Sequence, residues 1–314
     1  MRSWRNTFLV LVVFSLLLGG AHGQQATEEE TYRAEITRWR QHKDLRFRTS
    51  PFSRLALVHR EYLKERARVT LGSGPEADLR LAAPDIAPLH AVAVIEGSTL
   101  TPVLRAQGEA AIWSLNKPAR RLHKLTLKDN TGFRIGRFNL LYKLNPMWGR
   151  TLEVFDPEHP ALAAFTELDY FPIEPAYRIE AESIPSAQPE RITLIDSHGN
   201  PQPYWLYGEL RFSVQGTPCR LELYTLTLDP KEIATDGFML IFTDATSGKE
   251  SYPAARYLYV EGKTAGRITV DFNRAFSPPC NYSPVFTCPF PRLQNRLPVA
   301  IRAGEKWYRK KSGA

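Results

Sequence analysis

The segment that decides the fold is Leu210-Arg211-Phe212-Ser213-Val214-Gln215-Gly216-Thr217-Pro218-Cys219-Arg220-Leu221-Glu222-Leu223. Apolar and polar residues alternate on both sides of the Gln215-Gly216 pair. Side chains of a strand point alternately to its two faces, so this pattern predicts two strands joined by a tight turn. The segment therefore predicts a β-hairpin and, with it, an antiparallel sheet.

Other parts of the C-terminal half extend this sheet. Apolar residues alternate over 177–181 and 192–194, and further strands are expected over 256–260 and 266–272. The run Phe238-Met239-Leu240-Ile241-Phe242 is unbroken apolar, as expected for a strand covered on both faces. No parallel strand–helix–strand rhythm occurs, so the sheet should be predominantly antiparallel.

The N-terminal half has a different texture. Tyr32, Ile36 and Trp39 form one helical stripe, which predicts a helix of about four turns that packs on something larger. From about residue 55, short apolar stretches are broken by Gly, Pro and Asp, a spacing that predicts a β-sandwich or small barrel. The fold class expected for the whole chain is mainly β, with an N-terminal helix and two β-domains.

The first β-domain contains, in this order, Leu71-Gly72, Asp78-Leu79, His90-Ala91, Asn116-Lys117 and Ile135-Gly136. This order resembles that of a forkhead-associated domain, a β-sandwich that recognises phosphothreonine. This chain has Ser73 where that family places its phosphate-binding arginine, and Ala87 and Pro88 where it places a serine and an arginine. A phosphate would lose its charge-assisted hydrogen bonds without these donors. The resemblance thus implies the sandwich without phosphopeptide binding, and His90 is expected in the core or a turn.

The C-terminal segment contains a series of short motifs: Asn273-Arg274-Ala275, Pro278-Pro279-Cys280, Cys288-Pro289, Asn295-Arg296-Leu297-Pro298 and Gly304-Glu305-Lys306. This series resembles the signature of the bacterial family called domain of unknown function 1684. That family implies an architecture and no established reaction. The organisation expected is a signal peptide over 1–23, a helix and linker over 24–54, a forkhead-associated-like sandwich over 55–147, and a C-terminal β-domain over 148–314.

The N-terminus has the layout of a secretory signal. Arg2 and Arg5 precede the apolar run 8–18, and small residues ending at Gly23 predict cleavage near Gln24. The alternative is a membrane anchor, but the run is shorter than the roughly 20 residues that a membrane-spanning helix needs. We therefore expect an exported protein, periplasmic or secreted, with no transmembrane segment in the mature chain.

The charge of the expected mature chain is moderately positive. The full chain has 41 Lys+Arg and 33 Asp+Glu, and loss of Arg2 and Arg5 leaves 39 against 33, a net charge of +6. Much of the surplus lies between Arg33 and Arg68 and in the C-terminal tail. A solvated surface is the favoured interpretation, and no nucleic-acid partner is expected because no nucleic-acid-binding signature occurs. The oligomeric state cannot be predicted.

The cysteine pattern predicts a local disulfide. Cys280 and Cys288, both flanked by proline, are spaced for a disulfide in an oxidising compartment, and Cys219 would stay free and buried. Zinc is the competing interpretation. It is disfavoured because the last histidine is His198 and no second cysteine pair could complete four ligands, so no metal or other cofactor is expected.

No standard catalytic motif is present, so the candidate site is a polar constellation in the second domain. Asp244 directly follows the apolar strand, and period-two geometry places Asp271 and Asn273 on the solvent side of a later strand. The ligand-binding candidates are Asp244, Glu250, Tyr252, Arg256, Asp271, Asn273, Arg274, Asn295, Arg296 and Glu305.

Three interpretations of this constellation stay open. It could bind a polar or anionic envelope ligand, either a small molecule or a polymer, through arginine forks and carboxylates. It could belong to a hydrolase that uses Asp244 or Glu250 as general base. It could also be a structural network that satisfies the backbone of a long loop. We expect a binding or interaction module, and convergence of these side chains on an open hollow would distinguish the alternatives.

Overall fold

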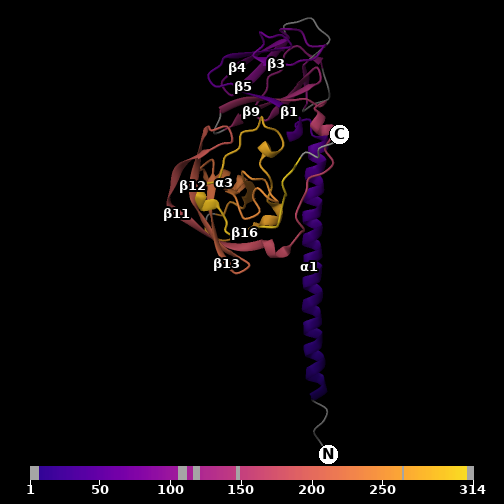
Figure 1. Ribbon diagram of the computed structural model, residues 1–314, viewed down its shortest axis with the longest axis vertical. Helices are drawn as coiled ribbons and strands as arrows, with labels where there is room; N and C mark the ends of the chain where they lie inside the picture. The colour runs from indigo at the N-terminus through magenta and orange to yellow at the C-terminus, as the bar shows by residue number, and fades with distance from the viewer. Residues whose placement is uncertain (1–6, 105–111, 116–120, 146–148, 264, 310–314) are drawn as a thin grey trace, which may run out of the picture.

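The structure, a computed structural model, describes residues 7–104, 112–115, 121–145, 149–263 and 265–309. The fold is mainly β with an N-terminal helix, as predicted. Figure 1 shows the sandwich at one end, the C-terminal domain in the middle and the helix along one side. Arg2 and Arg5 of the signal, and Asn116 and Lys117 of the forkhead-associated pattern, lie outside the described residues.

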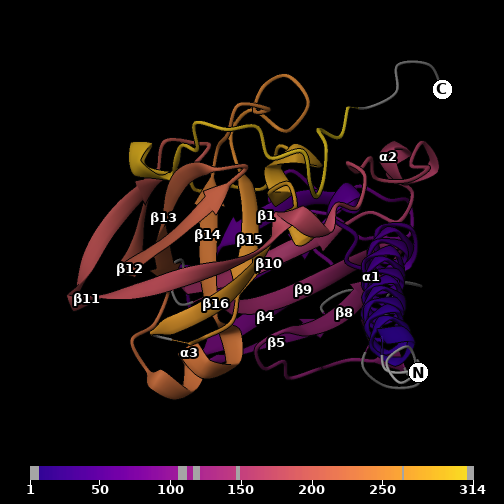
Figure 2. The same cartoon turned by 90° about the horizontal axis from the view of Figure 1, so that it is seen from below.

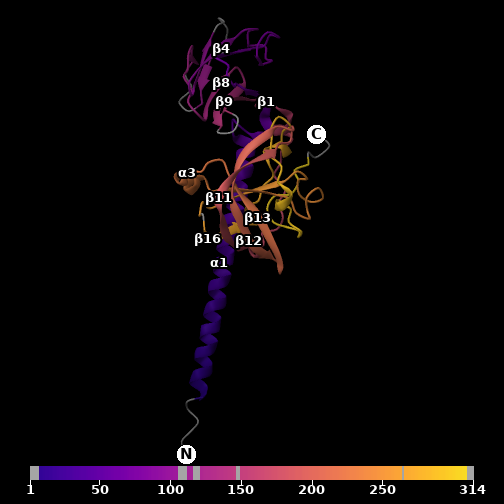
Figure 3. The ribbon, with the colours of Figure 1, turned by 90° about the vertical axis from the view of Figure 1, so that its left-hand side faces the viewer.

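A single helix, α1 (Thr7–Thr49), covers both the predicted signal and the predicted mature helix. It runs along the C-terminal domain and projects beyond it in two perpendicular views (Figures 1 and 3). Tyr32 and Ile36 are buried and Trp39 is half-buried, so the predicted stripe faces the protein. In the described part of the chain, no helix is both long and apolar enough to cross a bilayer.

The first domain is a sandwich of two sheets around one apolar core. The larger sheet has the order β1-β10-β9-β8-β6-β7 and the smaller one β3-β2-β4-β5. Their strands are β1 (Leu57–Tyr62), β2 (Arg68–Gly72), β3 (Leu79–Arg80), β4 (Ala91–Glu96), β5 (Thr99–Leu104), β6 (Ile112–Ser114), β7 (Arg121–Leu122), β8 (Thr131–Ile135), β9 (Phe138–Asn145) and β10 (Gly149–Phe155).

The sandwich ends later than the sequence predicts. β10 pairs with both β1 and β9, and Leu57 lies opposite Phe155. The expected boundary after residue 147 therefore falls inside this sheet. β10 does not alternate between buried and exposed residues. Its five consecutive residues from Thr151 to Phe155 are all buried, because one face of the strand lies on the sandwich core and the other on the second domain.

The loops that carry Ser73 and Ala87 are tied to each other by hydrogen bonds. Ser73 Oγ donates a hydrogen bond to the Ile86 carbonyl at 2.6 Å, and the Ser73 N–H donates to Ala87 O at 3.0 Å. His90 is fully buried, and its Nδ1 accepts the Ala87 N–H at 3.3 Å. His90 is thus a core residue at a turn, as expected.

The second domain is built on one antiparallel sheet with the order β15-β14-β13-β12-β11-β16. Its strands are β11 (Arg178–Ile195), β12 (Pro201–Val214), β13 (Thr217–Thr225), β14 (Phe238–Phe242), β15 (Arg256–Val260) and β16 (Gly266–Asp271). The end strands β15 and β16 contact each other, so the sheet curls toward closure, as Figure 2 shows. The predicted hairpin is confirmed: Val214 pairs with Thr217 across Gln215 and Gly216, which both have positive φ.

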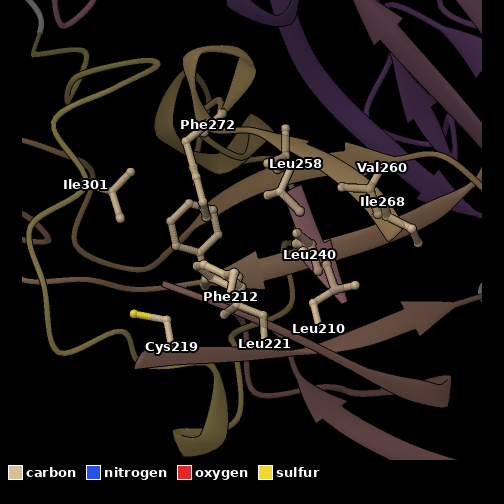
Figure 4. Close-up of a cluster of buried hydrophobic side chains, with 14 of the residues drawn as sticks. Leu210, Phe212, Cys219, Leu221, Leu240, Leu258, Val260, Ile268, Phe272 and Ile301 are labelled. Atoms are coloured by element: carbon tan, nitrogen blue, oxygen red, sulfur yellow. The ribbon is translucent and has the colours of Figure 1, made fainter. Parts of the chain in front are cut away.

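The sheet has two covered faces. Its inner face forms an apolar core with Phe272 and Ile301 of the C-terminal segment (Figure 4). Its outer face packs against Leu57, Leu141 and Phe155 of the sandwich. β14 contributes to both cores, which confirms the prediction of a strand buried on both sides.

The remaining elements are short. They are the helices α2 (Pro160–Ala163) and α3 (Pro230–Asp236), and the 3₁₀ turns η1 (Arg54–Ala56), η2 (Pro175–Tyr177), η3 (Phe272–Arg274), η4 (Pro279–Asn281) and η5 (Leu293–Asn295). The C-terminal segment after η3 makes only isolated bridges, such as Tyr257 with Phe276 and Thr243 with Arg296. Its backbone groups therefore need partners from side chains.

Candidate functional site

Asp244 and Arg256, two of the predicted ligand-binding residues, form a fully buried ion pair. Arg256 Nη2 lies 2.6 Å from Asp244 Oδ2, and neither side chain has solvent exposure. Asp244 Oδ1 also accepts the Thr246 N–H at 2.7 Å, while Arg256 donates to the carbonyls of Ile301 and Ala303. The pair ties the C-terminal segment to the ends of β14 and β15, and no substrate can reach it.

Asp271 and Asn273 do not share the open strand face that the sequence predicts. Asp271 Oδ1 accepts the Asn273 N–H at 3.0 Å, which ends β16 and starts a 3₁₀ turn. The turn rotates Asn273 into the interior, where its amide donates to Tyr32 of α1 and to Glu174 O. Arg274 pairs with Glu35 of α1. These three residues dock the N-terminal helix.

Asn295 and Glu305 each serve a separate buried network. Asn295 is fully buried, accepts the Glu222 N–H at 2.7 Å and donates to the Ile241 carbonyl at 2.9 Å. Glu305 binds Lys43 of α1 and accepts the Tyr282 hydroxyl and the Ser277 N–H, both at 2.6 Å. Burial lowers the pKa of Lys43, although Glu305 opposes that shift.

The last three candidates lie near the surface and apart from these networks. Glu250 pairs with Arg302 at 3.2 Å, Tyr252 packs edge-on against Trp307, and Arg296 is exposed. The ten candidates thus divide into separate networks and surface contacts. Contrary to the expectation from the sequence, they do not meet at one open hollow.

The cysteines lie close together without a bond. All three cysteines are free thiols in this structure, so the predicted Cys280–Cys288 disulfide is not present in it. The Cys280 N–H donates to Cys288 Sγ at 3.1 Å, and Cys219 is buried, as expected. A hydrogen bond from Cys288 lowers the pKa of Cys280, whereas burial raises the pKa of Cys288.

A different site lies where α1, the sandwich and the second domain meet. We call it the seam cleft; it consists of a small hollow of about 230 Å³ and a large hollow of about 610 Å³. Both are lined by Arg46, Ser50, Phe52, Arg54 and Phe276, so they are adjacent. The volume of the large hollow is in the range of small-molecule sites.

The charge of the seam cleft is strongly positive. Its lining includes one carboxylate and five cationic side chains: Glu153 and Lys43, Arg46, Arg54, Arg60, Lys143. Glu153 lies 2.6 Å from Arg60 and 3.9 Å from Lys143, and Lys43 is held by Glu305. The guanidinium groups of Arg46 and Arg54 form no ion pair or hydrogen bond with any residue that the structure describes.

Aromatic and aliphatic side chains form the opposite wall. Met239 and Tyr259 are cross-strand partners on the outer face of the second sheet, and the Tyr259 ring stacks on Phe276 with centroids 5.7 Å apart. Tyr259 is 60% exposed and Leu226 39% exposed, so the interdomain core leaves this part of the sheet uncovered. The seam cleft therefore combines unpaired cations with accessible apolar surface.

Sequence reasoning missed the seam cleft because its residues come from distant segments. The basic surplus between Arg33 and Arg68 was visible, but it favoured an ordinary solvated surface. Arg54 follows a Ser-Pro-Phe-Ser turn that carries no ligand-binding motif. Only the packing of β14 and β15 against the sandwich places this arginine opposite Tyr259 and Cys288.

The fold and this geometry describe a two-domain, mainly β protein with a cleft between its domains. The chain belongs to the protein family of unknown function DUF1684, whose model matches residues 163–306. A similar solved structure is that of an uncharacterised protein of Haloarcula marismortui. It is 31% identical, and the match covers 48% of this chain and 80% of that chain with a TM-score of 0.40.

Forkhead-associated domains are also among the similar structures. One from Mycobacterium tuberculosis is 19% identical over 32% of this chain and 95% of its own, with a TM-score of 0.21. One from Chlamydia trachomatis is 17% identical over the same shares, with a TM-score of 0.20. No curated protein matches this chain. Similarity at this level supports no conclusion about ligands.

Proposed function

We propose that this protein is a binding module for an anionic ligand outside the cytoplasm, and that the ligand occupies the seam cleft. The observation that carries the proposal is the pair of guanidinium groups, Arg46 and Arg54, which have no ion-pair or hydrogen-bond partner among the described residues and line both adjacent hollows. A guanidinium presents a planar fork of N–H donors that matches carboxylate and phosphate oxygens. Two of them at one cleft favour an acidic group over a neutral one.

The alternative for these arginines is a purely structural role. Arg46 lies in the last turn of α1, where a cation offsets the helix dipole. Arg54 has no such explanation, because it lies on the separate turn η1 and is only half exposed. A partly buried cation without a carboxylate partner is costly unless an anion compensates it. Arg54 is therefore the better diagnostic residue.

Titration calorimetry with a panel of anions tests this function. The panel contains inorganic phosphate, a series of alkyl phosphates and a sulfated polysaccharide, measured at low and high salt. We expect Arg54→Gln to weaken binding about 10- to 100-fold, since a charge-assisted hydrogen bond contributes about 1.5–3 kcal/mol. Arg38→Gln, an equal charge change on an exposed position of α1, is the matched control.

The proposal is lost if none of these anions binds, or if both variants weaken binding equally. Equal weakening would mean that net charge, and not the seam cleft, attracts the ligand. A melting curve of each variant shows whether it is folded, and Arg54→Gln should fold because Arg54 makes no ion pair or side-chain hydrogen bond with a described residue.

Export of the protein is also part of this proposal. It is supported by the charged, apolar and small-residue order of residues 1–23. Expression in a bacterial host followed by fractionation and intact mass measurement tests it. A mature chain that starts near Gln24 in the periplasm or medium is expected, and a full-length chain in the cytoplasm would refute export.

The hydrolase alternative finds no support in the geometry. Asp244 has no solvent exposure, and its oxygens accept hydrogen bonds from Arg256, the Thr246 N–H and the Ile301 N–H. Glu250 is at the surface, where Arg302 neutralises it. A general base needs an accessible oxygen within hydrogen-bond reach of the substrate, and neither carboxylate lines the seam cleft.

A further inference from the structure

We propose that the ligand of the seam cleft is an anionic amphiphile, a carboxylate or phosphate head carrying a long alkyl chain. This inference depends on the proposed function and specifies its ligand class. The head would lie at Arg46 and Arg54, where the two hollows adjoin. The chain would extend through the large hollow along the outer face of β14 and β15.

The position of the head follows from charge. Among the cationic side chains that line the cleft, Lys43 and Arg60 already have carboxylate partners, Glu305 and Glu153. Arg46 and Arg54 are left to neutralise an incoming anion. Arg54 also lies close enough to Lys43 of the small hollow and Cys288 of the large hollow to act on both electrostatically.

The position of the chain follows from the wall of the large hollow. Beyond the arginines, apolar and aromatic side chains from both domains form a large part of the lining, including Leu141, Leu144, Leu226, Met239, Tyr259 and Phe286. Three of them, Leu141, Met239 and Phe286, also belong to the interdomain core, so the hollow is continuous with apolar packing. Surface of this kind gains free energy when an alkyl chain removes it from water.

A small dianion or a polysaccharide fits this cleft less well. A free phosphate would satisfy the arginines and leave Tyr259 and Leu226 exposed. A polysaccharide needs several hydrogen-bonding groups along its length. The polar side chains of the large hollow lie mainly on the side of the sandwich, and there Arg60 already donates hydrogen bonds to Glu153. An amphiphile is complementary to both halves of the lining.

The test compares ligands that differ only in chain length. Binding of inorganic phosphate and of butyl, octyl and dodecyl phosphate to the full mature chain is measured by calorimetry below the micelle concentration. A parallel series uses acetate, octanoate and dodecanoate. A buried methylene contributes about 0.8 kcal/mol, so we expect affinity to rise about two- to fourfold per methylene.

Two substitutions locate the two ends of the ligand. Leu226→Asp should reduce dodecyl phosphate binding at least about tenfold and leave phosphate binding unchanged, because it places a carboxylate beside the chain only. Arg54→Gln should weaken both. Leu293→Asp is the matched control for the first change, since Leu293 is 84% exposed and lies outside both hollows.

The outcomes separate this inference from the function on which it depends. Anion binding that requires Arg54 but is independent of chain length refutes the amphiphile and keeps the anion site. Amphiphile binding unaffected by Arg54→Gln and Leu226→Asp refutes both, because detergent-like adsorption elsewhere then explains it. Loss of binding in Leu293→Asp to the same extent as in Leu226→Asp also refutes the placement of the chain.

Discussion

At the scale of residues, five of the ten predicted ligand-binding side chains lie in buried networks that hold separate segments together. Asp244, Arg256, Asn273, Asn295 and Glu305 are nearly or fully buried, and each forms hydrogen bonds with backbone groups of another part of the chain. Buried polar groups carry such a role when every hydrogen bond is made, and they become costly when one partner is removed.

Removal of one partner of the buried pair should therefore be severe. We expect Asp244→Asn to lower the free energy of unfolding by about 3–5 kcal/mol, because Arg256 keeps its charge in a dry environment. Glu250→Gln, which affects the exposed pair with Arg302, should cost less than about 1 kcal/mol. Urea denaturation at neutral pH measures both, and similar values for the two would contradict the assignment.

The two close thiols give a second prediction at this scale. Oxidised glutathione should accept two electrons and two protons from Cys280 and Cys288, form their disulfide and leave Cys219 free. The protein mass should fall by two hydrogen atoms, and peptide mapping should link these two cysteines. Under reducing conditions, iodoacetamide should modify Cys280 first, since its pKa is lowered and Cys288 is buried. Mixed disulfides at Cys219 would argue against this pairing.

At the scale of elements, the hairpin between β12 and β13 shows how a local sequence sets topology. Both turn residues have positive φ, 50° at Gln215 and 79° at Gly216, as a two-residue turn between right-twisted strands requires. Glycine adopts this conformation freely, and glutamine does so at some cost.

Substitutions in this turn should move stability in opposite directions. Gln215→Asn should raise the free energy of unfolding by up to about 1 kcal/mol, because asparagine tolerates positive φ better. Gly216→Ala should lower it by about 1–2 kcal/mol through backbone strain alone, since no atom lies within 4 Å of an added Cβ. Thermal unfolding of both variants provides the check, and shifts of the same sign would contradict the turn.

The contact between β2 and β3 gives a pH-dependent prediction. Hydrogen bonds from the Thr70 N–H at 2.8 Å and the Thr70 hydroxyl at 2.7 Å hold the pKa of Asp78 below its ordinary 3.8. At pH values between the lowered pKa of folded Asp78 and its ordinary value of 3.8, the unfolded chain binds more protons than the folded chain. The stabilisation is therefore present above pH 3.8 and is lost as the pH falls through the pKa of the folded state. In Asp78→Asn, the melting temperature should fall less steeply with decreasing pH in the acid range. An unchanged fall would show that Asp78 does not cause it.

At the scale of the whole molecule, α1 joins the parts that form the seam cleft. It contributes Arg46 to the cleft lining and is held to the second domain by Tyr32, Lys43 and Glu35, which contact Asp271, Glu305 and Arg274. The cleft is thus a product of three segments, and none of them contains it alone.

Truncation tests this role. A chain that starts at Gln24 should fold, whereas one that starts at Ser50 should melt at a clearly lower temperature, because Glu305, Asn273 and Asp271 lose buried partners. Circular dichroism of the two proteins measures the difference. Equal melting temperatures would show that α1 does not stabilise the second domain.

The sequence by itself determined the elements: the hairpin turn at Gln215-Gly216, the doubly covered strand at Phe238, the sandwich spacing and the helical stripe at Ile36 are all visible as local periodicity. It could not determine which polar residues face solvent, because Asp271 ends its strand with a cap and turns Asn273 inward. Only the tertiary structure decided that Arg54 stays unpaired opposite Tyr259 while Arg256 is buried with Asp244. Periodicity records how neighbouring residues point, whereas burial and pairing depend on which distant segments pack together.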